Sequence, residues 1–431
     1  MRLVHTADWH LGHAMAGHSR ASEHAQFLSW LTETLERDAV DGLIMCGDVF
    51  DHGHPAAAAQ RQLYTFLADV RRRLPSLAIV FIGGNHDTAA RLDAPGPVLD
   101  AVGVTMIGGL PRDNGNVCID RCVVPLRCGT DVEVAAIAVP FLRAPDLSLL
   151  SSGERVVVDG TRVVVERAVE RARALYPGVP IVALAHCELE GARLSLSSER
   201  PLFGGKHALP ADLFHDAGVD YAALGHLHLA QFLGTDGRAR YSGSPIPMSM
   251  AERDYAHQVV VVDVEPARVA VTKRLVPRTV DLIRIPDDAL GVGTRKAAPL
   301  DEVLDRLRAL DVPDRPVDAR PFLEVRVRLD RPVPDLRAQI DAALTGKAVR
   351  LVRVERERDG DGLALADMTA GAEASVALAD LSPQSVLRAL YGRHYQDPLP
   401  PALSDAFARL VDDDARARID PSADGATGEV V

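Results

Sequence analysis

The 431-residue sequence is short of cysteine, has no long apolar run and carries no excess of positive charge, and each shortage excludes a class of protein. Five cysteines are an odd number in a long chain, which argues against a disulfide framework and favours a reducing compartment. No segment approaches the roughly 18 apolar residues that a membrane helix requires. The first residues also lack the apolar stretch of a signal peptide. We therefore expect a cytoplasmic protein that does not engage a membrane.

The shortage of positive charge bears on nucleic-acid binding. With 48 basic and 60 acidic residues, the formal net charge is −12 at pH 7. This balance argues against a protein that holds nucleic acid by bulk electrostatic attraction alone, although a local basic groove is compatible with it. Part of the negative charge lies at residues 413–431, an acidic segment of low apolar content that we expect to be disordered.

Histidine, by contrast, is plentiful and unevenly placed. Fourteen of the fifteen histidines lie at or before His257, and only His394 follows. Histidine is the commonest metal ligand and the commonest acid–base residue near neutral pH. We therefore expect any such chemistry before His257 or close to it, and a different role for the rest of the chain.

Short apolar runs alternate with amphipathic stretches from the start of the chain. Residues 2–6, 42–46 and 78–82 are predicted to be buried strands, with helices at 22–37 and 55–74 between them. This alternation is typical of an α/β fold with a largely parallel sheet. Further elements are predicted downstream: strands at 132–139, 180–185, 221–224 and 257–264, and a helix at 161–176.

The pattern changes near residue 279. Alternating strands and helices over residues 279–358 predict a separate and smaller α+β unit. Two short helices are then predicted at 383–395 and 401–410, within a segment spanning 380–412. We therefore expect a main domain at 1–278, the α+β unit, a helical segment and the acidic end.

Polar side chains follow five of the predicted strands, at the sheet edge where parallel sheets bind ligands. The segments are Asp8-Trp-His10, Gly47-Asp48, Gly83-Gly-Asn-His-Asp87, His186 and Gly225-His226-Leu-His228. Each alone has an ordinary alternative, such as a surface turn, a capping residue or a hydrogen-bonded core histidine. Together they offer seven candidate metal ligands: Asp8, His10, Asp48, Asn85, His186, His226 and His228.

The donor types indicate which metals suit this set. Mixed oxygen and imidazole donors suit Mn²⁺, Fe²⁺ or Zn²⁺ better than Ca²⁺. Seven donors are too many for one ion and suit two ions that share a bridging carboxylate. Two divalent ions would leave the cluster positive, so the site would attract a phosphate.

In this order, the five segments resemble the calcineurin-like metallophosphoesterase superfamily over roughly residues 1–260. The resemblance implies an α/β fold with a two-sheet core. It implies that Asp8, His10 and His228 hold one ion. It also implies that Asn85, His186 and His226 hold a second ion and that Asp48 bridges the two. Hydroxide would attack the phosphodiester, His86 would protonate the leaving oxygen, and Asp87 would orient His86.

Longer segments narrow the resemblance to the SbcD family of nucleases. They are His5–Gly12, Gly47–Asp51, Ser198–Arg200, Gly204–Gly205, Asp220–His228 with Gln231, and Tyr241–Glu252. The resemblance implies a DNA nuclease with two divalent ions, of which Mn²⁺ is the one favoured by that analogy. It would act as an exonuclease on duplex ends and as an endonuclease on single strands and hairpins, in replication, recombination and repair. It also implies that 279–358 is a DNA-capping domain.

The same resemblance implies partners. Residues 380–412 would bind the coiled-coil base of an SbcC-like ABC-type ATPase, and two copies of the nuclease would pair as a homodimer within a heterotetramer. Helices 22–37 and 55–74 are candidates for that pairing, although Leu63, Phe66 and Leu67 fit core contacts equally well. Arg326 and Arg328 alternate on a predicted strand and so face one side, where they are candidates to track phosphates.

The sequence also allows other functions and other roles for some of these residues. A small-substrate phosphodiesterase of the same superfamily would need none of residues 280–410, and an inert DNA-end-binding scaffold would not need a complete ligand set. His52 and His54 are either substrate contacts or part of a solvated loop. Cys118, Cys122 and Cys128 lack paired CxxC spacing, so buried small hydrophobic residues are favoured over a metal site.

Overall fold

The computed structural model divides into two compact units, residues 1–358 and 359–431. The described residues are 1–153, 155–194, 208–234, 237–287, 297–329 and 333–357, with 391, 400, 403, 404 and 407. The acidic segment and the motif at 198–205 lie outside them, as do the predicted helices within 380–412 apart from those five positions. Over the part of the chain that is described, no helix combines the length and apolar character needed to cross a membrane.

The first of two six-stranded sheets has the order β16-β15-β1-β4-β5-β6. Its parallel strands are β1 (Arg2–Thr6), β4 (Gly42–Cys46), β5 (Ala78–Ile82) and β6 (Val104–Ile107). The antiparallel strands β15 (Gln258–Glu265) and β16 (Arg268–Leu275) complete it beside β1. The return of the chain to β1 after more than 250 residues closes the main domain around this sheet.

The second sheet has the order β13-β14-β12-β11-β10-β9. Its four central strands are parallel: β10 (Asp131–Val139), β11 (Ile181–His186), β12 (Tyr221–Gly225) and β14 (Ala239–Tyr241). The edge strands β9 (Val123–Cys128) and β13 (Gln231–Leu233) are antiparallel to their neighbours. Strands β1, β4, β5, β11 and β12 all end at the polar segments identified from the sequence.

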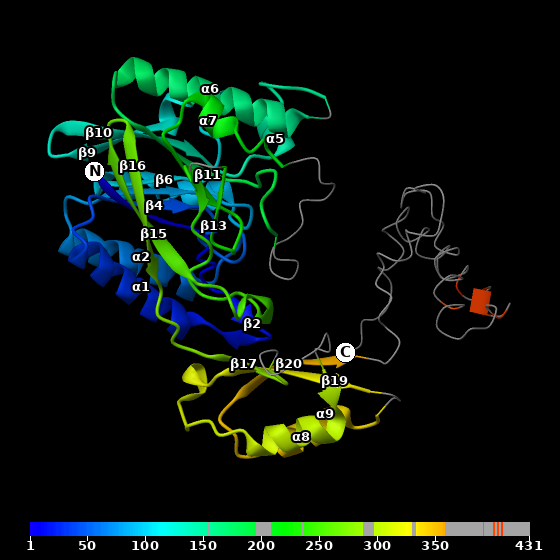
Figure 1. The fold of residues 1–431 in the computed structure, drawn as a ribbon. Helices are drawn as coiled ribbons and strands as arrows, with labels where there is room; N and C mark the ends of the chain where they lie inside the picture. Colours follow the sequence, from blue (N-terminus) through cyan, green and yellow to red (C-terminus); the bar gives the residue numbers. More distant parts are fainter. Residues whose placement is uncertain are drawn as a thin grey trace, which may run out of the picture. The chain divides into compact units, whose positions relative to one another are not determined.

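Helices cover the outer faces of the two sheets (Figure 1). Helices α1 (Ala21–Arg37) and α2 (Ala57–Arg73) pack on the first sheet, and α6 (Val156–Leu175) and α7 (Leu213–Ala217) pack on the second. The inner faces share one apolar core, in which Leu3 and Ile44 of the first sheet meet Ala136 and Val182 of the second. The two-sheet core that the sequence predicted is therefore confirmed, as a four-layer arrangement.

Shorter elements connect these layers. The short helices are α3 (Ala89–Asp93), α4 (Gly96–Ala101) and α5 (Ala144–Leu147), with single 3₁₀ turns at Ile119–Cys122 and Met250–Glu252. Two small hairpins pair β2 (Ala14–Met15) with β3 (His18–Ser19), and β7 (Arg112–Asp113) with β8 (Asn116–Val117). These elements lie in the connections between the main strands, where loops carry function.

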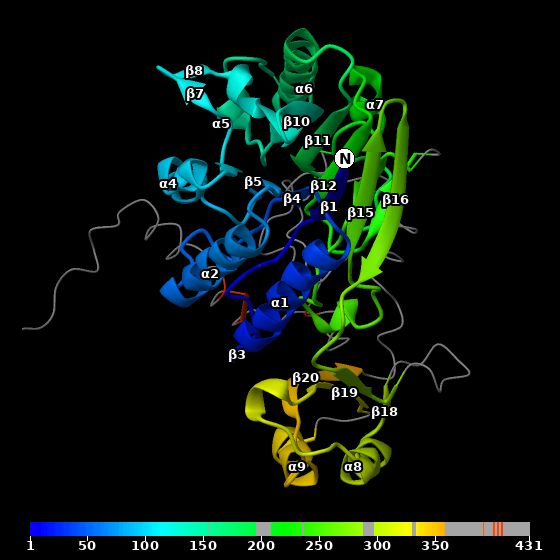
Figure 2. The same cartoon turned by 90° about the vertical axis from the view of Figure 1, so that its left-hand side faces the viewer.

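A smaller four-stranded sheet follows the main domain (Figure 2). Strands β17 (Leu282–Ile285), β18 (Ala298–Pro299) and β20 (Arg350–Glu357) all pair in parallel with β19 (Phe322–Arg328). Helices α8 (Leu300–Ala309) and α9 (Leu336–Ala343) bury Leu307 and Ile340 against this sheet, and a 3₁₀ turn occupies Val317–Ala319. The strands and helices predicted in this part of the chain are therefore present, with the strands in parallel. A domain boundary at residue 279 stays a prediction, since residues 1–358 form one compact unit.

The arginines of this unit are largely engaged by the protein itself. Arg326 lies 3.1 Å from Glu355 and 3.4 Å from Glu324, with 14% of its side chain exposed. The guanidinium of Arg350 lies 3.7 Å from the centre of the Phe322 ring. Because neighbouring carboxylates neutralise Arg326, the sequence-based suggestion that it tracks phosphates is not supported by its surroundings.

Three helix details differ from the sequence-based expectation. Helix α1 begins at Ala21, one residue before the predicted start, and the buried guanidinium of the preceding Arg20 binds Glu23 and the Pro247 carbonyl. Helix α2 begins two residues after Pro55. Helix α6 begins at Val156, five residues before the predicted start, since Val158 already packs in the core.

The two helices proposed to pair in a dimer also contribute to the core of the main domain. Leu63, Phe66 and Leu67 of α2 are 0–5% exposed and pack on the first sheet. These three side chains are therefore core contacts, as the ordinary alternative predicted, and they are not available to a second copy of the chain.

Candidate metal centre

The loops that follow β1 and β4 are held together by their own backbones. The amide of Asp8 donates to the Gly47 carbonyl, and the amide of His10 donates to the Asp48 carbonyl, both at 3.0 Å. Asp8, His10 and Asp48 adopt positive φ angles of 54°, 47° and 54°. Non-glycine residues rarely occupy this region, and they cluster at functional sites when they do. This backbone arrangement places the three side chains at one edge of the first sheet.

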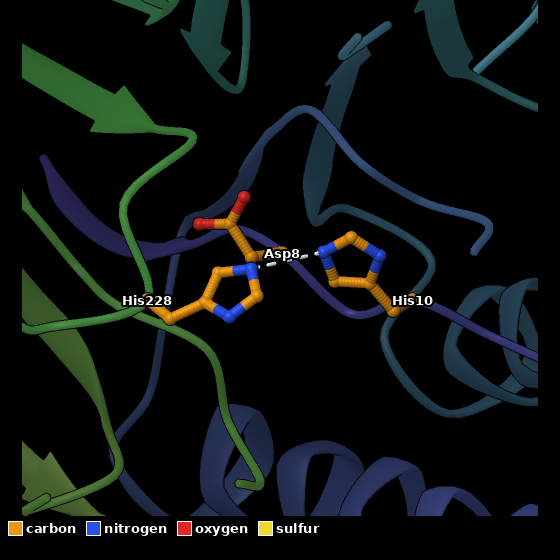
Figure 3. Close-up of side chains that lie close together, drawn as sticks. All are labelled: Asp8, His10 and His228. Atoms are coloured by element: carbon orange, nitrogen blue, oxygen red, sulfur yellow. Dashed lines mark hydrogen bonds between the residues drawn. The ribbon is translucent and has the colours of Figure 1, made fainter. Parts of the chain in front are cut away.

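Asp8, His10 and His228 form the first candidate ligand group (Figure 3). Their ligand atoms lie within 4.8 Å of one another, and the Nε2 atoms of His10 and His228 are 3.2 Å apart. The other ring nitrogen of His228 donates to Glu252 Oε1 at 2.9 Å, so Nε2 carries a lone pair when the ring is neutral. A bound cation would satisfy this lone pair together with one on His10 Nε2, if that ring carries its proton on Nδ1.

Asn85, His186 and His226 form the second group, built on the second sheet and the loop after β5. Asn85 Oδ1 lies 2.9 Å from His186 Nε2 and 2.9 Å from His226 Nδ1. His186 already donates its Nδ1–H to the Cys46 carbonyl at 2.8 Å, so in the neutral ring its Nε2 is an acceptor that faces another acceptor. This juxtaposition of an amide oxygen and an imidazole lone pair also fits a bound cation.

Asp48 lies between the two groups. Its Oδ2 is 3.6 Å from His10 Nε2 and 3.6 Å from His186 Nε2, while its Oδ1 accepts the His86 amide at 2.8 Å. Burial alone would raise the pKa of Asp48, but His186, His10 and the His86 amide bring it to about 2. An ionised carboxylate equidistant from both groups is placed as a bridging ligand would be.

The histidines at this centre are held in the form that binds metals. Burial lowers the pKa of His10 to about 4 and that of His226 to about 3, and it also lowers the pKa of His186. Neutral imidazole is the ligand form, so all three are ready to coordinate near pH 7. The seven predicted ligands thus meet at one place, and their donor types and facing lone pairs fit two divalent ions.

The glycine after β5 makes this packing possible. A Cβ on Gly84 would lie 2.1 Å from Asp48 Oδ1 and 2.2 Å from its backbone nitrogen. No side chain fits at such distances, so only glycine lets the Asn85 loop approach the bridging carboxylate.

His86 and Asp87 do not interact in the way the sequence suggested. The Nδ1 of His86 donates to the backbone carbonyl of Asp51 at 2.8 Å, so Asp51 orients the ring. The Asp87 carboxylate instead accepts the amides of Val49, Phe50 and Gly84 at 2.9–3.0 Å. The orienting role predicted for Asp87 is therefore wrong, because adjacent side chains in the loop point to different sides. Asp87 holds the loops after β4 and β5 together.

Two residues near the ligands were not assigned a role from the sequence. Glu252 binds the ring of His228 through Oε1 and accepts the Met248 amide at 2.9 Å through Oε2. The Asp51 carboxylate lies 3.3 Å from His10 Nδ1 and 3.1 Å from His13 Nδ1. Both stand at the ends of segments that carry the resemblance, Tyr241–Glu252 and Gly47–Asp51, which is the signal that could have identified them.

We expect a Glu252→Gln substitution to lower the affinity for divalent metal by about 10–100-fold, because His228 would lose the carboxylate that fixes its tautomer. Isothermal titration of the metal-free protein with Mn²⁺ measures this affinity. A Glu188→Gln variant, which alters a half-buried acid outside both ligand groups, is the matched control. Equal affinities for Glu252→Gln and the wild type would contradict the role of Glu252.

The pH dependence of stability follows from the buried histidines. Burial lowers the pKa of His5, His24 and His226 to about 3 and of His10 to about 4, from an ordinary 6.5. The unfolded chain therefore binds more protons between these values, so stability rises with pH across that window. Asp87 makes stability fall as the pH rises, because burial and the Asp48 charge raise its pKa to about 7. The four histidines together outweigh this single group.

We therefore expect the unfolding midpoint of the metal-free protein to fall steadily as the pH is lowered from 6.5 towards 4. Thermal unfolding followed by circular dichroism across this range measures the trend. A midpoint that stays constant or rises on acidification would show that the imidazoles are not buried as neutral groups.

The remaining predicted residues lie outside the ligand groups. His52 is 67% exposed and lies 3.0 Å from Asp51, in agreement with a solvated loop. Among the described residues, the groups able to hold a metal include none of the cysteines. Cys122 is buried, whereas Cys118 is half-buried and Cys128 is exposed, so burial explains only one of the three.

Comparison with known proteins adds family information. The calcineurin-like phosphoesterase model matches residues 1–230, and the type 5 capsule protein repressor C-terminal domain model matches residues 278–395. Three relatives are each named as the SbcD component of the SbcCD nuclease. The relative from Rhodobacter capsulatus is 42% identical to this chain. The alignment covers 81% of this chain and 86% of that relative. The relative from Escherichia coli K12 is 29% identical, and the alignment covers 83% of this chain and 86% of that relative. The relative from Bacillus subtilis 168 is 33% identical, and the alignment covers 63% of this chain and 68% of that relative.

Proposed function

Since the chain belongs to the SbcD family of calcineurin-like phosphoesterases and is a metal-dependent hydrolase of phosphodiester bonds, we propose that it cuts DNA in two ways. It degrades duplex ends as an exonuclease, and it nicks single strands and hairpins as an endonuclease. It acts with an SbcC-like ABC-type ATPase on DNA ends and hairpins during replication, recombination and repair. Two copies of the nuclease pair within the assembly.

The observation that carries this proposal is the position of Asp48, 3.6 Å from one imidazole of each ligand group. Asp8, His10 and His228 would hold one ion, and Asn85, His186 and His226 the other, with Asp48 shared. The mixed donor set suits Mn²⁺, Fe²⁺ or Zn²⁺, and Mn²⁺ is the ion that the family resemblance favours. When bound, a pair of divalent ions neutralises phosphate charge and makes hydroxide available near neutral pH.

The chain's own residues supply the proton that the leaving oxygen needs. The His86 ring lies 4.8 Å from the His10 ring, at the edge of the ligand cluster. The Asp51 carbonyl accepts the Nδ1–H, so the proton for the leaving oxygen comes from Nε2 of the ring in its protonated form, and the neutral ring with Nδ1–H remains. Because Asp87 ties the His86 loop to the loop after β4, the acid and the bridging carboxylate keep one relative position.

The charge distribution supports a need for the ATPase partner. The formal net charge is −12, and Arg326 and Arg350 of the smaller unit are engaged by protein groups. Phosphate contacts by basic residues dominate the affinity for DNA. We therefore expect the isolated chain to hold DNA weakly and the partner to supply much of the binding.

A nuclease assay with Mn²⁺ tests the proposal, using linear duplex, hairpin and single-stranded DNA, with and without the SbcC-like ATPase. Cleavage of all three DNA forms, abolished by a chelator, is the expected result. A cyclic nucleotide serves as the competing small substrate. Hydrolysis of the cyclic nucleotide alone, even with the ATPase present, would make the chain a small-substrate phosphodiesterase and would overturn the proposal.

A further inference from the structure

A cavity of about 340 Å³ lies beside the candidate metal centre, and His186 is the one proposed metal ligand among its lining residues. It runs between the ends of β10 and β11 and the helices α6 and α7. Its wall is mainly apolar and includes Val139, Leu142, Val157, Leu209 and Phe214. Phe141, Arg143 and His186 line the side next to the metal ligands. The cavity therefore borders the candidate metal centre at His186.

Phe141 is tied to the loop that carries Asn85 and His86. Its amide donates to the Gly83 carbonyl at 2.9 Å, and its ring centre lies 6.1 Å from that of His186 in an edge-to-face arrangement. The ring is half-buried, so part of it is accessible. An aromatic ring held in register with metal ligands is a suitable platform for a planar group attached to the bound phosphodiester.

Arg143 completes the entrance to this cavity. Its guanidinium carbon lies 5.3 Å from the centre of the Phe141 ring, and its Nη2 is 3.3 Å from the Asn85 carbonyl. The side chain is exposed at the surface. Arginine stacks on planar rings and attracts phosphates, so the entrance combines the two features that a nucleotide requires.

We propose that this cavity receives the base of one nucleotide adjoining the scissile phosphate, stacked against the face of the Phe141 ring that Arg143 does not cover. The inference rests on the proposed nuclease function and adds a base subsite to it. A base fits the cavity in volume, in its apolar wall and in its position directly beside the ligand His186. The wall is mainly apolar, with Thr161 and Glu188 among its few polar side chains, so stacking dominates and binding there tolerates most bases.

The subsite has a consequence for substrate choice. A base inside the duplex is stacked and paired, so it must leave the helix before it enters the cavity. Frayed ends, hairpin loops and single strands supply such bases at the lowest cost. The same cavity would therefore favour the DNA forms that the proposed function names.

The test uses the full chain with Mn²⁺ and an oligonucleotide that has one cleavable phosphodiester. The base on either side of that bond is removed in turn, leaving an abasic sugar. Stacking is worth about 1–3 kcal/mol per base, so removing the bound base should slow wild-type cleavage by about 5–150-fold. Phe141→Ala should be slowed to a similar extent on the intact substrate and should be insensitive to base removal, whereas Phe141→Tyr should behave as the wild type.

A matched control is available on the second sheet. Phe232 is an exposed phenylalanine that, like Phe141, has an arginine 5.3 Å from its ring centre, here Arg240, but it does not line the cavity. Phe232→Ala should therefore keep the sensitivity to base removal. If Phe141→Ala does not fold, Arg143→Ala replaces it, because that side chain is exposed, and a weaker response to base removal is expected.

A binding measurement gives a second readout without metal. A 2-aminopurine at the sensitive position should change its fluorescence on binding the metal-free wild type but not on binding Phe141→Ala. Equal slowing of the wild type and Phe141→Ala by base removal would overturn the inference, as would a wild type that is indifferent to both bases. If the wild type cuts no DNA at all, the proposed nuclease function fails instead.

Discussion

An Asp48→Asn variant is expected to lose at least about 10³-fold in nuclease activity, because the bridging position would lose the negative charge that two cations share. The substitution keeps the volume of the side chain. It also keeps one oxygen that can accept the hydrogen bond from the His86 amide, which lies 2.8 Å from Asp48 Oδ1 in the wild type. The loss would therefore come from metal binding and not from a collapsed loop. We expect fewer than two ions per chain at saturating Mn²⁺, measured by elemental analysis after gel filtration.

The opposite end of the same strand offers a matched control. Asp41 directly precedes β4, where its carboxylate accepts the Arg2 amide at 2.7 Å, whereas Asp48 follows the strand. Asp41→Asn removes one negative charge beside the start of β4 and changes no candidate metal ligand. It should retain full activity and metal content. An Asp48→Asn protein that binds two ions and cuts at the wild-type rate would refute the bridging role.

A His86→Gln variant is expected to lower kcat by about 10²–10⁴-fold while leaving the metal content unchanged. His86 lies outside the two proposed three-residue ligand groups, although one of its ring nitrogens is within 4.8 Å of ligand atoms of His10 and Asp48. Its Nδ1 is engaged by the Asp51 carbonyl at 2.8 Å. Its removal therefore takes away a proton donor and spares the ligands. Single-turnover cleavage at saturating Mn²⁺ measures the chemical step.

The nature of the leaving group separates acid catalysis from other roles. A substrate whose leaving atom is sulfur needs little protonation, so the His86→Gln variant should recover most of its activity on such a bond. His52→Gln, at an exposed position in the loop that follows Asp51, is the control and should behave as the wild type on both substrates. An equal defect of His86→Gln on oxygen and sulfur leaving groups would show that His86 acts only in binding.

The residues that meet at the candidate metal centre could be predicted from the sequence because of the topology of parallel sheets. The alternation of strands and helices predicted that β1, β4 and β5 lie side by side, and their carboxyl ends must then meet at one edge. Residue types at those ends, such as Asp8 and His10, could therefore be assigned to one site without coordinates. The fold class was equally accessible, although strands such as β9, β13 and β16 were not identified, since short or half-exposed edge strands lack a continuous apolar pattern.

Contacts between side chains could not be predicted in the same way. His10 and His228 are 218 residues apart in the chain, and their 3.2 Å approach depends on how the two sheets pack through a shared core. The orientation of His86 by the Asp51 carbonyl depends on a loop with no periodic pattern, so the neighbouring Asp87 was the natural but incorrect choice. The register of packed side chains comes from many non-local contacts that no local pattern encodes.

By itself, the sequence determined the fold class, the donor types and the order in which they occur, because strand periodicity and residue chemistry are local properties. Only the tertiary structure decided which partners these side chains meet. It pairs Arg326 with Glu324 and Glu355, and it places Glu252 against His228. It also sets Phe141 at the border of a cavity beside the metal centre. Such contacts arise where distant segments pack together, and packing is a property of the whole chain.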